Sequence, residues 1–264
     1  MNKKFIAGGC SFTFGHELSD DESGNTPSKM SWAHGLKPNS ADEYICTAHP
    51  GSGNSGIARR VFEAVANNQD IRCVIVMWSF LSRYDWAMPR HRELEKTRWA
   101  SISPWDTSTG SEEALKTIQE SRTQKEQWQN RIQTFEKTGV RPFADAIYKH
   151  AANQYHETYL SWKSIIWLQN ILEKKEIPFM FTLADNSLFY KEMEHHKDQD
   201  PLMKALHDEI DLNKWFSFGE RMMGFNQWAL LEDYPRGTTH PLDEAHRDAV
   251  KLMLPTFNKL IGGE

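Results

Sequence analysis

Cysteine is scarce in this sequence, and nothing in it resembles a metal-binding knuckle. Three cysteines, Cys10, Cys46 and Cys73, are scattered over 264 residues. An odd and scattered set excludes both a disulfide framework and a CxxC metal site. Cys46 and Cys73 stand in apolar, strand-like runs, so we expect buried free thiols, which suits a reducing compartment.

Long apolar runs and a basic excess are also missing. No segment approaches the roughly 20 apolar residues of a membrane-spanning helix. The apolar stretch before Cys10 is shorter than the roughly 7–15 residues that an export signal needs. The net charge of −5 disfavours nucleic acid. We therefore expect a cytoplasmic protein without membrane or nucleic-acid partners, and the sequence leaves its oligomeric state open.

Apolar strands alternate with amphipathic helices along the chain. Strands are expected at 4–8, 43–47, 72–78, 179–183 and 214–218, and helices around 57–65, 155–175 and 243–260. The unbroken run at 72–78 is typical of a parallel strand covered on both faces. This order predicts a three-layer α/β/α sandwich with a central parallel sheet, in which the loops after the strands share one edge.

Residues 87–150 differ from the rest of the chain. They are polar and only weakly periodic, which indicates an insertion that is helical in part, around 112–135. We expect residues 1–264 to form a single domain that carries this insertion.

A serine follows the first predicted strand directly. Residues 8–15 read Gly-Gly-Cys-Ser-Phe-Thr-Phe-Gly, which places Ser11 at the carboxyl end of that strand and at the start of a turn. Free N–H groups in such a turn can bind an oxyanion. The same glycines could cradle a phosphate, but the segment matches neither GxGxxG nor a P-loop. A nucleotide-binding module is therefore the weakest hypothesis.

A histidine precedes the last predicted helix. His240 is followed by Pro241, which restricts the backbone beside it. A lone loop histidine is usually a surface residue, but chain order brings His240 to the same sheet edge as Ser11. The pair predicts a serine nucleophile and its base.

These segments resemble the conserved blocks of the SGNH (GDSL-like) hydrolases. Residues 9–15 resemble the first block, Gly-Asp-Ser-x-Thr-x-Gly, with Cys10 in place of Asp, and residues 239–241 resemble the fifth block, Asp-x-x-His-Pro. Residues 50–54, Pro-Gly-Ser-Gly-Asn, resemble the second block, whose glycine donates an N–H to the oxyanion. The resemblance implies a flavodoxin-like fold. Within the family, the sequence resembles the divergent SGNH-like proteins that are common in phage and environmental bacterial genomes.

The sequence departs from the family pattern at the oxyanion site. Ser79 stands where the third block has its asparagine. Either the Ser79 hydroxyl or the Asn54 amide is a candidate replacement, beside the N–H groups of Ser11 and Gly51. Arg83, near the same edge, is a candidate for binding an anionic substrate group, and a structural salt bridge is equally compatible with its position.

The acid that orients the histidine is also missing. Gly237 stands three residues before His240, where the family has Asp, and Asp243 is better explained as a helix cap. We expect a Ser–His dyad or an irregular triad, and we leave His16 and Glu17 unassigned. His195 and His196 lie in a charged stretch typical of a solvated face, so no metal is expected.

The resemblance implies hydrolysis of a carboxylic ester without a cofactor. The substrate would be a small molecule or a carbohydrate ester, with O-acetyl groups as one candidate. The two missing family residues motivate an alternative, a catalytically reduced binding or structural protein on the same fold, in a phage setting. Retention of both Ser11 and His240 favours the enzyme.

Overall fold

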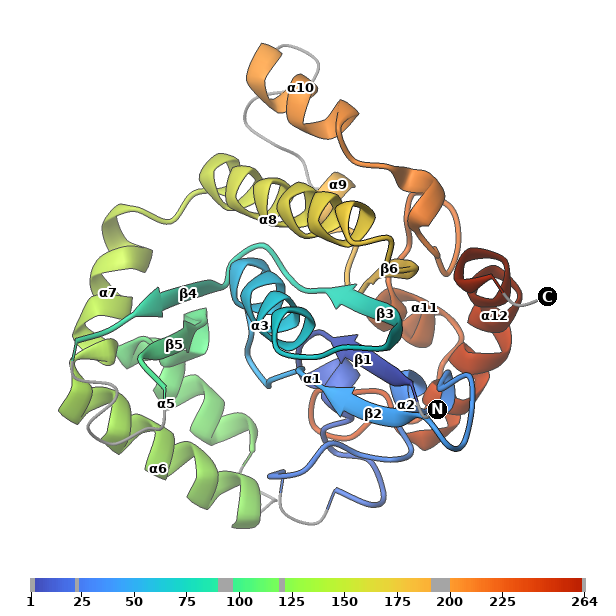
Figure 1. The fold of residues 1–264 in the computed structure, drawn as a ribbon. Helices are drawn as coiled ribbons and strands as arrows, with labels where there is room; N and C mark the ends of the chain where they lie inside the picture. Colours follow the sequence, from blue (N-terminus) through green and yellow to red (C-terminus); the bar gives the residue numbers. More distant parts are fainter. Residues whose placement is uncertain (1–2, 22–23, 90–96, 119–121, 191–199, 263–264) are drawn as a thin grey trace.

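A parallel sheet forms the centre of the computed structural model, which describes residues 3–21, 24–89, 97–118, 122–190 and 200–262 (Figure 1). The strand order is β2-β1-β3-β6, and every pair is parallel. The strands are β1 (Lys4–Gly8), β2 (Glu43–Cys46), β3 (Ile71–Trp78) and β6 (Phe179–Leu183). The predicted fold class is confirmed, and the order is that of flavodoxin-like sheets.

Both faces of the sheet are covered by helices. Side chains of a strand alternate between faces, and along β3 the residues Val74, Val76 and Trp78 belong to one buried cluster while Ile75 and Met77 belong to another. The first cluster includes residues of α3 (Asn54–Ala66) and α8 (Gln154–Lys174). The second includes residues of α2 (Trp32–Gly35), α11 (Phe225–Leu231) and α12 (Asp243–Ile261). Burial on both faces explains the apolar run over residues 73–78 of β3.

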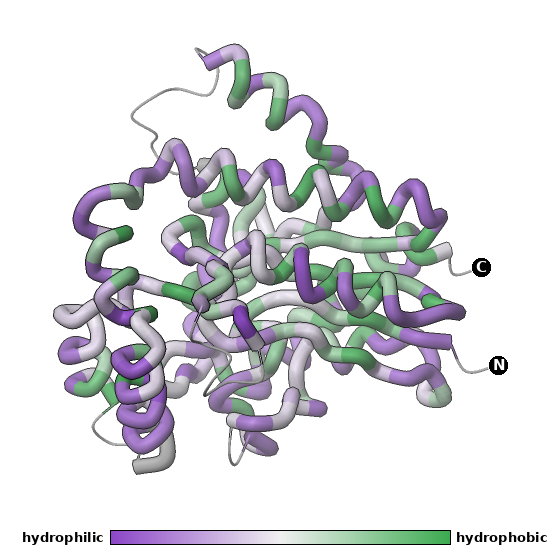
Figure 2. The backbone as a smooth tube through the Cα atoms, turned by 60° about the vertical axis from the view of Figure 1, so that its left-hand side comes forward, coloured by the Kyte–Doolittle hydropathy of each residue, from purple (hydrophilic) through white to green (hydrophobic). Residues whose placement is uncertain are grey.

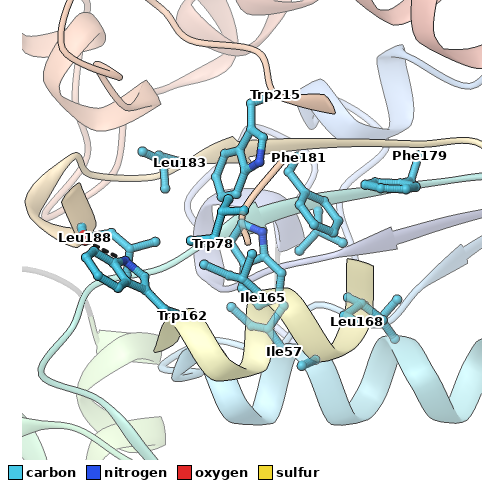
Figure 3. Packing of buried hydrophobic residues seen from close by; sticks show 14 of the residues in the cluster. Ile57, Trp78, Trp162, Ile165, Leu168, Phe179, Phe181, Leu183, Leu188 and Trp215 are labelled. Atoms are coloured by element: carbon cyan, nitrogen blue, oxygen red, sulfur yellow. Dashed lines mark hydrogen bonds between the residues drawn. The ribbon is translucent and has the colours of Figure 1, made fainter. Parts of the chain in front are cut away.

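Aromatic side chains fill much of the first cluster (Figure 3). Trp78 packs edge-on against Phe181, with ring centroids 5.3 Å apart, and Phe181 packs in the same way against Trp215 at 5.4 Å. Trp162 is fully buried, and its indole Nε1 donates to the Leu188 carbonyl over 3.0 Å. Several of the chain's tryptophans therefore serve packing, since each buries a large apolar area.

Two details of the predicted elements need correction. The expected fifth strand at 214–218 is reduced to a single parallel bridge between Phe181 and Trp215. Asp243 is not the cap of the last helix: Leu242 holds that position, and the Asp243 carboxylate accepts an N–H from Ser19 over 3.1 Å. The remaining short elements on this part of the chain are α9 (Ser187–Tyr190), α10 (Pro201–Asp208) and η3 (Leu212–Lys214).

The polar segment after β3 forms a subregion beside the sheet. It contains the antiparallel pair β4 (Tyr84–Ala87) and β5 (Trp99–Ile102), then η1 (Pro104–Asp106), α5 (Ser108–Thr117), α6 (Arg122–Thr138) and α7 (Val140–His150). Residues of β4, β5, α6 and α7 form a hydrophobic cluster of their own. The elements of this subregion lie together at one side of the sheet in Figure 1, and Figure 2 shows α6 as largely hydrophilic.

A buried histidine connects the last helix to the core. His246 is 1% exposed, and its Nδ1 accepts the N–H of Trp32 over 3.0 Å. Burial lowers the pKa of His246 to about 3, from 6.5. Between pH 3 and pH 6.5, His246 is therefore protonated in the unfolded chain but neutral in the folded chain. This difference makes the fold less stable as the pH falls below 6.5.

A His246→Asn variant should show a weaker loss of stability at acidic pH. Its amide oxygen can still accept the Trp32 N–H, but it cannot titrate. Between pH 7.5 and 5.5, the free energy of unfolding in urea should fall by about 1 kcal/mol less in this variant than in the wild type. His150→Asn, at an exposed position on α7, is the matched control. Equal losses in the wild type and in His246→Asn would contradict the prediction.

Among the described residues, no helix is both long enough and apolar enough to cross a bilayer.

Candidate active site

Ser11 lies in a sharp turn at the carboxyl end of β1. It is the first residue of α1 (Ser11–Phe14), a short helix whose Phe14 N–H bonds to the Cys10 carbonyl over 3.0 Å. Gly9 makes this turn possible, because its backbone has φ 156° and a Cβ there would overlap the Thr13 hydroxyl. The turn holds the Ser11 hydroxyl at the edge of the sheet.

His240 reaches Ser11 from the loop before α12. A short antiparallel bridge joins Arg236 to Pro241, and the Gly237 N–H donates to the His240 carbonyl over 2.9 Å. This tight loop directs the imidazole towards β1. Its Nε2 lies 2.7 Å from the Ser11 Oγ, although the two residues are 229 positions apart. The geometry is that of a nucleophile hydrogen-bonded to its base.

Glu17, to which the sequence pattern gives no role, completes the arrangement. Its Oε2 lies 2.7 Å from Nδ1 of His240, and the Glu17 side chain is only 7% exposed. The carboxylate also accepts the backbone N–H groups of Thr238, Thr239 and His240, over 2.8, 3.0 and 3.0 Å. One side chain therefore holds both the ring of His240 and the loop that carries it.

The backbone of Glu17 is in the left-handed region, with φ 69°. This conformation costs of order 1–3 kcal/mol for a residue other than glycine. The Glu17 N–H donates to the Asp21 carboxylate over 2.9 Å, which supports the turn. A conformation that local preference disfavours is thus held by tertiary contacts, and it directs the carboxylate at the loop before α12.

Gly237 occupies the position where the family pattern has its acid. A Cβ at residue 237 would lie 3.0 to 3.2 Å from the carboxylate atoms of Glu17. The space that a side chain at 237 would need is therefore filled by the carboxylate of Glu17. This explains how the loop can lack an Asp while His240 retains an acidic partner.

A second histidine lies against the first. The rings of His16 and His240 meet edge to face with centroids 5.5 Å apart. Burial lowers the pKa of His16, and the nearby His240 lowers it further. This lowered pKa favours the neutral form of His16, so it disfavours a second positive charge beside the His240 ring.

Gly51 lies on the neighbouring loop, after β2. This loop is joined to the turn that carries Ser11, because the His49 N–H donates to the Gly9 carbonyl over 3.2 Å. Ser11 and Gly51 line the same cavity. Within the described ranges, the backbone N–H groups of Ser11 and Gly51 donate to no protein acceptor. Two such N–H groups are the usual content of an oxyanion hole.

Asn54 and Ser79, the two side-chain candidates for the oxyanion, are engaged elsewhere. The Asn54 amide nitrogen donates to the Ser79 carbonyl over 3.2 Å and to the Ser161 hydroxyl over 2.9 Å, while its oxygen accepts the Ser79 N–H over 2.7 Å. The Ser79 hydroxyl is fully buried and accepts from Arg83. Neither residue lines the cavity. Their contacts fasten the end of β3 to α3 and α8, so we do not assign them as oxyanion donors.

The cavity in front of Ser11 has a volume of about 500 Å³. Ser11, Gly51 and His240 line it on the sheet side, and Trp105, Trp128 and Arg131 line it on the side of the inserted segment. Arg131 on α6 pairs with Asp106 of η1 over 2.6 Å and donates to the Ser101 carbonyl over 2.8 Å. The segment that was expected to be an insertion thus builds a wall of the cavity, which its weak periodicity did not reveal.

Arg83 also lines this cavity. Its Nη1 donates to the Ser79 Oγ over 2.8 Å, and its guanidinium lies 4.7 Å from the centre of the Phe80 ring. The sequence therefore identified a residue of the cavity, although the partner of Arg83 is a hydroxyl and not a carboxylate.

No cluster of His, Cys, Asp and Glu suited to a metal ion occurs in the described part of the chain. His195 and His196 lie outside the described residues.

No family model matches the sequence, and no curated protein matches it either. Among solved structures, the fold is similar to a member of the lipolytic protein G-D-S-L family from Veillonella parvula DSM 2008. That comparison has 10% identity, a TM-score of 0.43, and coverage of 98% of this chain and 100% of the other. An acetyl xylan esterase from the rumen bacterium Butyrivibrio proteoclasticus is also similar, with 10% identity, a TM-score of 0.43, and coverage of 98% of this chain and 64% of that one.

Proposed function

We propose that this chain is a serine hydrolase of the SGNH type that cleaves carboxylic esters with Ser11, His240 and Glu17. The observation that carries the proposal is the hydrogen-bonded series from Ser11 Oγ through both ring nitrogens of His240 to the Glu17 carboxylate, with both distances at 2.7 Å. This is the geometry of a nucleophile, its base and an orienting acid, which is recognised by roles and not by chain order.

Each residue has a defined part in the reaction. The Ser11 Oγ attacks the ester carbonyl while His240 Nε2 takes the hydroxyl proton, and the Glu17 carboxylate stabilises the resulting imidazolium. The N–H groups of Ser11 and Gly51 bind the oxyanion of the tetrahedral intermediate. His240 then gives the proton to the leaving alkoxide, and the acyl group stays on Ser11. Water, deprotonated by His240, then attacks the acyl carbon, and His240 returns the proton to the Ser11 Oγ as the carboxylic acid leaves.

The alternative of a catalytically reduced protein rested on the missing acid and the missing asparagine. Glu17 supplies an acid from another part of the chain, which removes the first reason. Two backbone N–H groups suffice for an oxyanion hole in other serine hydrolases, which weakens the second. These two observations favour an enzyme over a catalytically reduced protein.

The residues that line the cavity indicate which class of substrate would fit it. Trp105 and Trp128 line the cavity, and Trp105 is 42% exposed. Exposed aromatic rings offer flat apolar faces to a ligand. An ester of a small molecule or of a carbohydrate, such as an O-acetyl sugar, suits a cavity of this size and lining.

Labelling with an alkyl fluorophosphonate tests the nucleophile directly. The wild type should gain one phosphonyl group with loss of fluoride, and peptide mass mapping should place it on Ser11. Ser11→Ala should remain unlabelled, while Ser40→Ala, at an exposed position outside the cavity, should label like the wild type. A folded wild-type protein that neither labels nor hydrolyses short-chain esters would contradict the proposal.

A further inference from the structure

One cationic side chain of the cavity is not paired with a carboxylate. Two arginines line it, Arg83 and Arg131. The guanidinium of Arg131 is neutralised by Asp106, whose carboxylate is buried and 2.6 Å from Nε. The carboxylate of Glu17 is hydrogen-bonded to the His240 ring and to the backbone of its loop. Arg83 has no carboxylate within ion-pair distance in the described ranges. The cavity thus carries one cation without a counter-charge from the described residues.

Arg83 is held by one end of its guanidinium. Nη1 donates to the hydroxyl of Ser79, and the guanidinium lies near the Phe80 ring. Ser79 is fully buried, and its backbone N–H donates to the Asn54 side chain. Nε and Nη2 make no hydrogen bond to the described part of the protein. These two nitrogens form one edge of the guanidinium, and their parallel N–H groups match the two oxygens of a carboxylate.

We infer that Arg83 selects an ester that carries a carboxylate of its own. This inference rests on the proposed esterase function and names its substrate class: a monoester of a dicarboxylic acid, or an ester of an alcohol that bears a carboxylate. Arg83 binds the carboxylate through its free edge, while Ser11 attacks the ester carbonyl in the same cavity. Hydrogen bonds to charged groups are strong enough to favour such a substrate over a neutral isostere by about 10- to 100-fold.

Paired substrates test the inference on each side of the ester. On the acyl side, kcat/KM for the 4-nitrophenyl monoester of glutaric acid is compared with that for 4-nitrophenyl butyrate. On the alcohol side, 3-acetoxybenzoate is compared with phenyl acetate. The wild type should prefer the anionic member of one pair, and the preference should fall by roughly tenfold or more in Arg83→Gln. Arg83→Lys should keep part of it, because the charge remains without the two-pronged edge.

Two controls make the outcome specific. Arg247→Gln changes an exposed arginine of α12 outside the cavity and should keep the wild-type preference. Thermal melting by circular dichroism shows whether each variant is folded. Turnover of the neutral esters with no anionic preference in either pair, or with a preference that Arg83→Gln leaves intact, would overturn the inference and leave the esterase proposal standing.

A binding measurement separates the two proposals. Calorimetric titration of monomethyl glutarate into Ser11→Ala needs no turnover, and binding should weaken about tenfold or more when Arg83→Gln is added. Equal binding by both proteins would overturn the anion site. Arg83-dependent binding by a protein whose wild type hydrolyses none of the esters would support the anion site and count against the esterase.

Discussion

A Ser11→Ala variant should lose about 10⁵- to 10⁶-fold in kcat on short-chain esters, which leaves little above the background rate. Alanine removes the nucleophilic oxygen, and His240 Nε2 then has no hydroxyl at 2.7 Å to deprotonate. The backbone N–H of residue 11 remains, so binding and the oxyanion contact persist. KM, or the affinity for a substrate, should therefore change much less than kcat.

Steady-state kinetics with 4-nitrophenyl acetate, corrected for spontaneous hydrolysis, measures this loss. Ser40→Ala serves again as the matched serine variant and should retain wild-type kcat. A Ser11→Ala protein with more than about one tenth of wild-type activity would place the nucleophile elsewhere in the chain. In that case the short contact between Ser11 and His240 would have a structural role.

Glu17→Gln should lower kcat by about 10³- to 10⁴-fold, which is the effect of losing the acid of a serine triad. In the proposed mechanism the carboxylate stabilises the imidazolium that forms during attack, and a neutral amide would not do so. The amide nitrogen would also face backbone N–H groups of the 238–240 loop, which are donors and need an acceptor. We therefore expect a loss of activity together with a smaller loss of stability.

Two measurements separate these effects. The rate of fluorophosphonate labelling at Ser11 reports nucleophile activation, and it should fall in Glu17→Gln at a temperature where circular dichroism shows a folded protein. Glu17→Asp keeps the charge on a shorter side chain and should recover part of the rate. Labelling at the wild-type rate in Glu17→Gln would mean that Glu17 only supports the loop.

A transplanted acid offers a stricter test of the same assignment. Residue 237 faces the Glu17 carboxylate, and Gly237 leaves this space free of its own side chain. Glu17→Ala should be nearly inactive, and the double variant Glu17→Ala/Gly237→Asp should regain activity because it puts a carboxylate back beside His240 Nδ1. Glu17→Ala/Gly237→Asn, with an amide of the same shape, is the control and should stay inactive. Equal rates in the two double variants would show that charge at this position is unimportant.

The strands of the sheet were predictable because their signal is local. The unbroken apolar run of β3 reflects burial on both faces, and the turn at Gly9 follows directly from the glycines that allow it. The bridge at Trp215 was predicted as a full strand, because a short apolar run does not reveal how many of its residues find a partner.

The site depended more on contacts between distant parts of the chain. Asn54 and Ser79 were reasonable oxyanion candidates by position, but both are buried, and Asn54 hydrogen-bonds to the Ser79 backbone and to the Ser161 hydroxyl. Trp105, Trp128 and Arg131 come from a polar segment whose weak periodicity carried no sign of a cavity wall. The ion pair between Arg131 and Asp106 joins residues 25 positions apart, and no motif marks it.

The sequence by itself determined the parallel α/β architecture and the meeting of Ser11 with His240 at one sheet edge, since strand burial and the carboxyl-end rule depend on local pattern and chain order. Only the tertiary structure decided that Glu17 is the acidic partner. Its left-handed backbone at φ 69° is disfavoured locally, and its carboxylate is held by a loop 223 residues further along. A contact of this kind arises from the packing of two loops against each other, so the absence of Asp at 237 was visible in the sequence while its replacement was not.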